Sequence, residues 1–232
     1  MSRDHKILMY DGTMFDPFHP KEEDINIINI AHGLSRENRF SGQNPGLPYT
    51  VAQHSVTVSA NCCPDHALAG LLHDAAEGLG LRDMATPIKH SFWMWPYRNA
   101  ENKLQKLIYK RFECGSRIAD GEWGWSMDYG IPDCVRKADR EAFEVEKAAL
   151  FPPYGADIRC WSPAEAEHRF LARFAELTQH HWTPISLMGG VMRQANRKWA
   201  VDHKRNNGAV LDLETWGKVN YPEINYGRGK AE

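Results

Sequence analysis

The sequence contains few cysteines and no apolar run long enough to cross a membrane. No stretch approaches the roughly 18 apolar residues that a membrane span requires. The start, Met-Ser-Arg-Asp-His-Lys, leads into only four apolar residues, too few for a signal-peptide core. The five cysteines include no Cys-x-x-Cys pair, so they indicate neither a disulfide framework nor a thiolate zinc site. We therefore expect free thiols in a cytoplasmic protein.

A strong net charge, internal repeats and low-complexity tracts are also absent. The formal net charge is only -2, so no global field favours nucleic acid or an anionic membrane. Any phosphate ligand must therefore be held by a local group of positive side chains. The 42% hydrophobic and 25% charged residues are ordinary globular usage, and 232 residues suffice for one sizeable core.

Strand patterns are scarce, and helical periodicity dominates the chain. The prolines and the Asp-Gly pair near the N-terminus predict a small β-flap within residues 1–22. Apolar spacing and capping residues predict helices over about 24–34, 50–62, 64–80, 97–112, 131–150 and 162–177. We predict an all-α helical bundle with a domain over 1–182 and a C-terminal extension over 183–232, packed on or beside it.

The most informative stretch is residues 68–77, Leu-Ala-Gly-Leu-Leu-His-Asp-Ala-Ala-Glu. His73 and Asp74 interrupt an apolar helical pattern, and Glu77 follows at helical spacing. A charged group on a buried surface needs a partner, because leaving it unpaired costs free energy. A divalent metal ion would supply that partner.

Two more polar residues fall beside predicted inward faces, so four side chains from three predicted helices form a candidate ligand set: His54, His73, Asp74 and Asp139. Two imidazoles and two carboxylates suit Mn, Fe, Co, Ni or Zn as divalent ions better than Ca. Taken singly, His54 also fits a hydrogen-bonded core histidine. Asp139 likewise fits an aspartate paired with a neighbour such as Arg136 or Arg140.

The order His54, His73-Asp74, Asp139 resembles the H…HD…D signature of HD-domain metal-dependent phosphohydrolases. The surrounding residues extend the resemblance, which runs from about Asp24 to Leu177. They are similar to the bacterial 5'-deoxynucleotidase branch and to phage-type HD phosphohydrolases, which include a dATP triphosphohydrolase. The segments that carry it are Arg39-Phe40-Ser41, Gln53-His54-Ser55, Leu72 to Glu77, Asp83 to Lys89 and Lys137-Ala138-Asp139.

The resemblance implies a role for each matched residue. The four ligand positions would bind one divalent metal (Co, Mn, Zn, Fe, Ni or Mg). Glu77 would work with the activated water as a catalytic residue, and Asp83 would lie near the phosphate and the leaving oxygen. Arg39 would grip the phosphate, while Phe40 stands where the bacterial enzyme has a Trp against the deoxyribose. Lys89 would add a positive charge for the substrate.

The implied function is metal-dependent hydrolysis of deoxynucleotides, releasing either phosphate or triphosphate by attack of water on phosphorus. We also expect a homo-oligomer, dimeric or higher, in the cytoplasm of a bacterial or phage-infected cell. A deoxynucleotide is the expected partner, and neither a membrane nor nucleic acid is.

Two other functions compete with hydrolysis of nucleotides. One is a nucleic-acid-binding or regulatory module with a structural metal, which would use the basic cluster in the extension: Arg193, Arg197, Lys198, Lys204 and Arg205, interleaved with Trp199. A solvated helix face or a subunit contact is the simpler explanation of that cluster. The other is an HD-type phosphodiesterase, but the Gly-Tyr-Pro motif of its cyclic-dinucleotide branch is absent from the chain.

Overall fold

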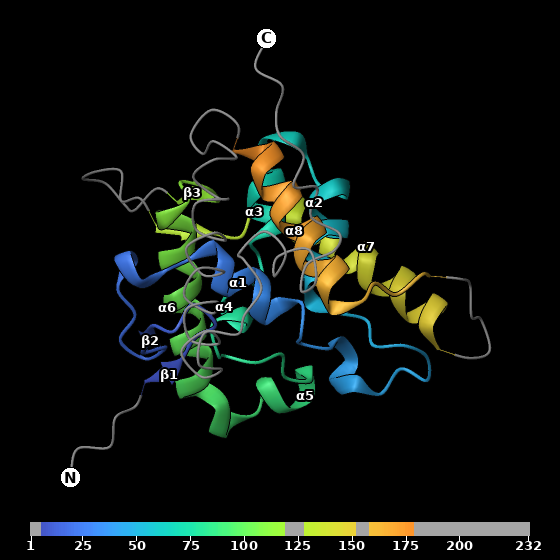
Figure 1. The fold of residues 1–232 in the computed structure, drawn as a ribbon, viewed down its shortest axis with the longest axis horizontal. Coiled ribbons are helices and arrows are strands. Elements are labelled where there is room, and N and C mark those ends of the chain that lie inside the picture. Colours follow the sequence, from blue (N-terminus) through green and yellow to red (C-terminus); the bar gives the residue numbers. More distant parts are fainter. Residues whose placement is uncertain (1–5, 119–127, 152–157, 179–232) are drawn as a thin grey trace, which may run out of the picture. The chain divides into compact units, whose positions relative to one another are not determined.

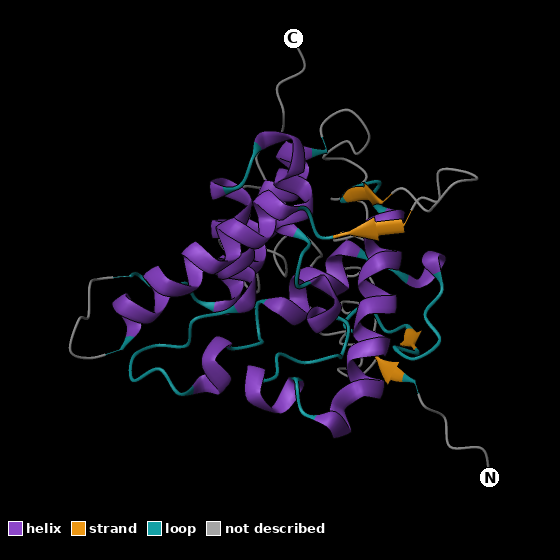
Figure 2. Ribbon diagram, turned by 180° about the vertical axis from the view of Figure 1, so that it is seen from behind, coloured by secondary structure: helices purple, strands orange, loops and turns teal. Residues whose placement is uncertain are grey.

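A computed structural model describes residues 6–118, 128–151 and 158–178 of the chain. Helices make up most of this part, so the all-α prediction is confirmed (Figures 1 and 2). The chain divides after Gln179 into two units. The proposed boundary at 182/183, the extension and its basic cluster lie outside the described residues.

The helices follow the order that periodicity predicts, with short 3-10 turns between them. The α-helices are α1 (Ile27–Leu34), α2 (Val51–Asn61), α3 (Ala67–Leu71), α4 (Ala75–Gly78), α5 (Thr86–Lys89), α6 (Trp95–Arg111), α7 (Asp133–Leu150) and α8 (Pro163–Leu177). The 3-10 helices are η1 (Glu22–Asp24), η2 (Arg39–Gly42), η3 (Pro64–His66) and η4 (Phe92–Met94).

Two helix starts are set by the capping residues that the sequence shows. The Thr50 hydroxyl accepts a hydrogen bond from the backbone N–H of Gln53 at the start of α2. The Ser162 hydroxyl does the same for Glu165 at the start of α8, where Pro163 occupies the first helical position. Each cap satisfies a backbone donor that the helix leaves free, so both predicted starts are confirmed.

The core lies where α2 packs against α3, α7 and α8, while α1 packs against α4 and α8. Figure 1 shows α7 and α8 running beside α2 and α3. Gly33 of α1 faces Gly78 of α4 so closely that a Cβ on Gly33 would collide with the Gly78 backbone. Glycine at both positions lets the two helices approach closely, which packs α4 against α1.

The central helix predicted from Pro64 to about Gly80 is broken, and this prediction is wrong in that respect. The break falls at Leu72 to Asp74, between α3 and α4. The Gln105 side chain of α6 donates to the carbonyl of Leu72 and accepts from the N–H of Ala76, at 2.6 and 3.2 Å. A distant side chain thus satisfies backbone groups that a continuous helix would pair internally. The ligand pair His73-Asp74 therefore lies in a turn.

Two small antiparallel sheets accompany the helices. The predicted β-flap is confirmed as β1 (Ile7–Leu8) paired with β2 (Met14–Phe15), with Ile7 opposite Phe15. A second pair, β3 (Ser116–Ile118) and β4 (Asp128–Gly130), lies between α6 and α7 in sequence. The short helix α5 was not among the predicted helices.

The prediction of free thiols is wrong for two of the five cysteines. Cys63 and Cys134 are joined as a disulfide, with their Cα atoms 6.1 Å apart, while Cys62, Cys114 and Cys160 are free. The partners are 71 residues apart in sequence, so their spacing carries no local signal. Among the described helices, none has the length and apolar character to span a bilayer.

Candidate metal centre

The four predicted ligands converge on one point. His54 Nε2 lies 3.3 Å from His73 Nε2 and 3.0 Å from an oxygen of Asp139. An oxygen of Asp74 lies 3.1 Å from His73 Nε2 and 3.8 Å from His54 Nε2. His54 comes from α2, Asp139 from α7 and the other two from the break between α3 and α4. Asp139, the residue most easily explained as a surface aspartate, points toward the other three.

Both imidazoles are oriented for metal binding by the hydrogen bonds that their other ring nitrogens make. His73 Nδ1 donates to the carbonyl oxygen of Gly70 at 2.8 Å, and His54 Nδ1 donates to Glu146 Oε1 at 2.7 Å. With the proton held on Nδ1, each neutral ring presents the lone pair of Nε2 to the shared point. Two such lone pairs facing each other repel unless a cation lies between them.

Glu146 is a functional residue that the sequence analysis missed. It is buried on α7, with only 1% of its surface exposed. Its carboxylate accepts hydrogen bonds from His54 and from the Tyr49 hydroxyl, and it lies 3.1 Å from Arg39 Nε. Seven residues separate it from Asp139, so both face the same side of a helix. That spacing was the available signal.

The charges around this point attract positive charge. Burial lowers the pKa of His73, but Asp74 and Asp139 outweigh burial and raise that pKa well above its ordinary value. Burial raises the pKa of Asp139, whereas hydrogen bonds from His54 and His73 outweigh it and lower the pKa overall. A divalent ion would compete with protons for this point. The described residues therefore include a group, His54, His73 and Asp74, that is able to hold a metal ion.

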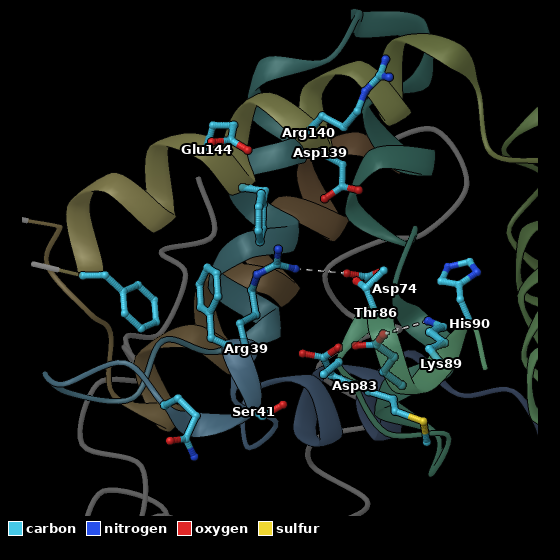
Figure 3. A pocket seen from close by; sticks show the side chains of 17 residues that line it. Arg39, Ser41, Asp74, Asp83, Thr86, Lys89, His90, Asp139, Arg140 and Glu144 are labelled. Carbon is cyan, nitrogen blue, oxygen red and sulfur yellow. Dashed lines mark ion pairs between the residues drawn. The ribbon is translucent and has the colours of Figure 1, made fainter. Parts of the chain in front are cut away.

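The ligands open into a pocket of about 910 Å³, a size that suits a small-molecule ligand. Figure 3 shows Asp74, Asp139 and Arg39 pointing into one space, with Asp83 and Lys89 below them. His54 and His73 are buried beneath the lining. All the other predicted site residues line the pocket: Arg39, Phe40, Asp74, Glu77, Asp83, Lys89 and Asp139.

Glu77 and Lys89 form a charged pair at one side of this pocket. Burial raises the pKa of Glu77 well above its ordinary value, and repulsion from Asp74 and Asp83 adds to the effect. One Glu77 oxygen is buried with no hydrogen-bond partner, and the other lies 3.9 Å from the Lys89 ammonium. Lys89 in turn donates to Glu101 at 2.6 Å. The Glu77 carboxyl is thus suited to hold or pass on a proton.

Asp83 also lines the pocket. Burial raises the pKa of Asp83, Asp74 raises it further, and Arg39 opposes both.

Arg39 and Phe40 lie in η2 and line the same pocket. The Arg39 guanidinium approaches Asp74 at 3.7 Å while its Nε faces Glu146. The Phe40 ring packs against Phe143 and Phe151, with centroids 5.6 and 5.2 Å away. Phe40 and the following Ser41 both have positive φ, at 56° and 52°, a region that bulky residues rarely occupy. Such strain is common at ligand-binding sites, because the surrounding contacts hold it in place.

Comparison with known proteins places the chain in a family without naming its activity. No family model matches the sequence. The chain is 38% identical over 210 residues to an uncharacterized protein of Rhodobacter capsulatus, covering 78% of this chain and 96% of the relative. The chain belongs to the family of this uncharacterized protein.

Proposed function

We propose that this protein is an HD-domain phosphohydrolase that hydrolyses deoxynucleotides with a divalent metal ion. One observation carries the proposal. Two imidazoles with protonated Nδ1 and two carboxylates meet at the floor of a pocket of about 910 Å³. A set of nitrogen and oxygen donors fits a first-row divalent ion, and it leaves positions open toward the pocket. The resemblance of the ligand order to the HD-domain enzymes adds the reaction class.

The side chains around the floor have separate roles in the proposed hydrolysis. When bound, the metal ion would supply Lewis-acid polarisation of a phosphoryl oxygen and would acidify water. Arg39, held at its Nε by Glu146, presents its remaining N–H groups to phosphate oxygens. Glu77, whose pKa is raised by burial, takes or returns a proton during attack on phosphorus. Lys89 adds a positive charge beyond the first phosphate.

The wall formed by Phe40, Phe143 and Phe151 favours an apolar face of the substrate. A deoxyribose presents carbon where a ribose carries its 2'-hydroxyl. Burying that hydroxyl against aromatic carbon without a partner costs free energy, so we expect a preference for deoxynucleotides.

The test uses the purified full-length chain with each deoxy- and ribonucleotide, from mono- to triphosphate, in the presence of Mn, Co, Mg or Zn. Chromatography identifies the products. We expect metal-dependent release of phosphate or triphosphate, abolished in His73→Ala and in Asp74→Ala. His19→Ala changes a histidine whose side chain is 81% exposed, so it should keep full turnover. Turnover retained in both site variants would refute the proposal. No turnover with any nucleotide, together with salt-sensitive DNA binding, would favour the regulatory alternative.

A further inference from the structure

A second cluster of metal-binding side chains lies away from the pocket. It consists of Cys63, His66 and Cys134, all half-buried. His66 Nδ1 lies 3.2 Å from the sulfur of Cys63 and 3.2 Å from the sulfur of Cys134. Cys63 precedes η3, His66 ends it, and Cys134 stands in the first turn of α7. None of the three lines the pocket.

The three side chains form one set of donor atoms. The Cα separation of 6.1 Å for Cys63 and Cys134 lies inside the roughly 4.4–6.8 Å range of disulfides. A disulfide, however, uses only two of the three members and leaves the imidazole nitrogen between two sulfurs that need no partner. A metal ion uses all three, because thiolate and imidazole are the ligands that Zn²⁺ prefers.

The neighbouring Cys62 provides an internal contrast. Its sulfur approaches the backbone oxygens of Ser59 and His66, at 3.7 and 3.6 Å, and it does not join the cluster. Two adjacent cysteines thus have different surroundings. Cys63 faces an imidazole and a second thiol, whereas Cys62 behaves as an ordinary helix-end residue. The local spacing Cys63-x-x-His66 places two donors on one short turn, which the sequence analysis overlooked by considering only Cys-x-x-Cys.

We propose that, when the Cys63–Cys134 pair is reduced to two thiols, Cys63, His66 and Cys134 bind a second divalent ion of the zinc class. This site is separate from the nitrogen and oxygen site and independent of the proposed function. The ion would have three protein ligands, and its fourth position would take water because all three side chains are partly exposed. It would tie the first turn of α7 to the segment that leads into α3. Asp139 follows Cys134 by five residues and His73 follows His66 by seven. This site therefore holds together the two segments that carry ligands of the first site.

Cobalt distinguishes the two sites, because thiolate ligands produce an intense near-ultraviolet charge-transfer band with Co²⁺ and nitrogen or oxygen ligands do not. The full-length chain is purified with a reductant, stripped of metal and titrated with Co²⁺ alone. We expect two ions per chain and the thiolate band. Asp74→Ala should lose one ion and keep the band. Cys63→Ser and His66→Gln should each lose one ion and weaken or abolish the band, while Cys62→Ser should retain both.

X-ray absorption on the zinc-loaded wild-type chain requires no variant, and it should show sulfur neighbours at about 2.3 Å from zinc. Absence of the thiolate band and of sulfur neighbours in the reduced wild-type chain would overturn the proposal. A disulfide that survives reduction and metal loading would also overturn it. Mass spectrometry would then find the chain two hydrogens lighter than its fully reduced form, and a digest would contain a peptide cross-linked through Cys63 and Cys134. That result would assign the pair to a stable disulfide. Loss of nucleotide hydrolysis alone would bear on the proposed function and not on this site.

Discussion

The floor and the rim of the pocket are held by different kinds of structure. At the floor, His54 and Glu146 lie on the long helices α2 and α7, with 0% and 1% of their surfaces exposed. At the rim, Phe40 and Ser41 lie in a short 3-10 turn with positive φ, and residues 84–90 form an exposed segment around α5. The floor is thus positioned by packing of the core, and the rim by local turns.

This difference separates two roles within one pocket. Small displacements of a buried ligand are opposed by every neighbour in a close-packed core, so the floor is suited to hold a fixed coordination geometry. The side chains at the rim contact fewer neighbours, so the rim tolerates substitution, as loops generally do. We expect changes at the floor to remove metal binding and turnover together, and changes at the rim to alter substrate preference alone.

The largest effect is expected at the floor from Asp139→Asn. The amide keeps the shape of the side chain but removes the negative charge that a metal ligand supplies. We expect turnover to fall by about 10³-fold or more, because metal catalysis contributes several kcal/mol. Metal content, measured by elemental analysis, should fall with it. Asp24→Asn, an exposed aspartate in η1, is the control and should change neither. Full metal content and full turnover in Asp139→Asn would contradict the role of the floor in metal binding.

Glu146→Gln tests the layer beneath the ligands. Its carboxylate orients His54 and Arg39, so its loss should weaken metal binding by about 10- to 100-fold, as supporting hydrogen bonds to ligands typically do. Metal titration of the stripped chain measures the change. Glu141→Gln is a matched control on the same helix, since that side chain is 63% exposed and its ion-pair partner Lys137 is exposed as well. Equal metal affinity in both variants would show that Glu146 serves packing alone.

Gln105→Leu tests what holds the His73-Asp74 turn. The substitution removes the partner of the buried Ala76 N–H and leaves this donor unsatisfied. It also removes one of the donors to the Leu72 carbonyl, which keeps its hydrogen bond from the Ala75 N–H. We expect the free energy of unfolding to fall by about 2 kcal/mol. Denaturant titration of the metal-free chain measures it without interference from bound ion. Asn102→Leu, at an exposed position of the same helix, should stay within about 0.5 kcal/mol of wild type. A Gln105 variant as stable as wild type would mean that the break needs no side-chain cap.

Phe40→Ala should give the smallest effect and the most selective one. It removes the ring that packs on Phe143 and Phe151 but leaves the ligands untouched. We expect KM for the best deoxynucleotide to rise about tenfold, since one aromatic contact is worth about 1.4 kcal/mol. The preference over the matching ribonucleotide should shrink, and metal content should stay at the wild-type level. Loss of metal in this variant would show that rim and floor are coupled.

Much of the floor was predictable because its signals are local. Hydroxyl caps at Thr50 and Ser162 set helix starts through bonds to residues three positions later, and the structure has both. The four ligands were found because two imidazoles and two carboxylates beside apolar faces need a partner. Glu146 was missed because a glutamate in a helix is usually solvated, and its spacing from Asp139 was a weaker signal than that general rule.

The amino-acid sequence by itself determined which segments form helices and in what order the four ligand residues follow one another. Periodicity and capping act between residues a few positions apart, so they can be read along the chain. Only the tertiary structure decided that Gln105 breaks the central helix, that Glu146 supports His54, and that Cys63 and Cys134 meet. These contacts join groups 33, 92 and 71 residues apart, and packing of whole helices brings them together.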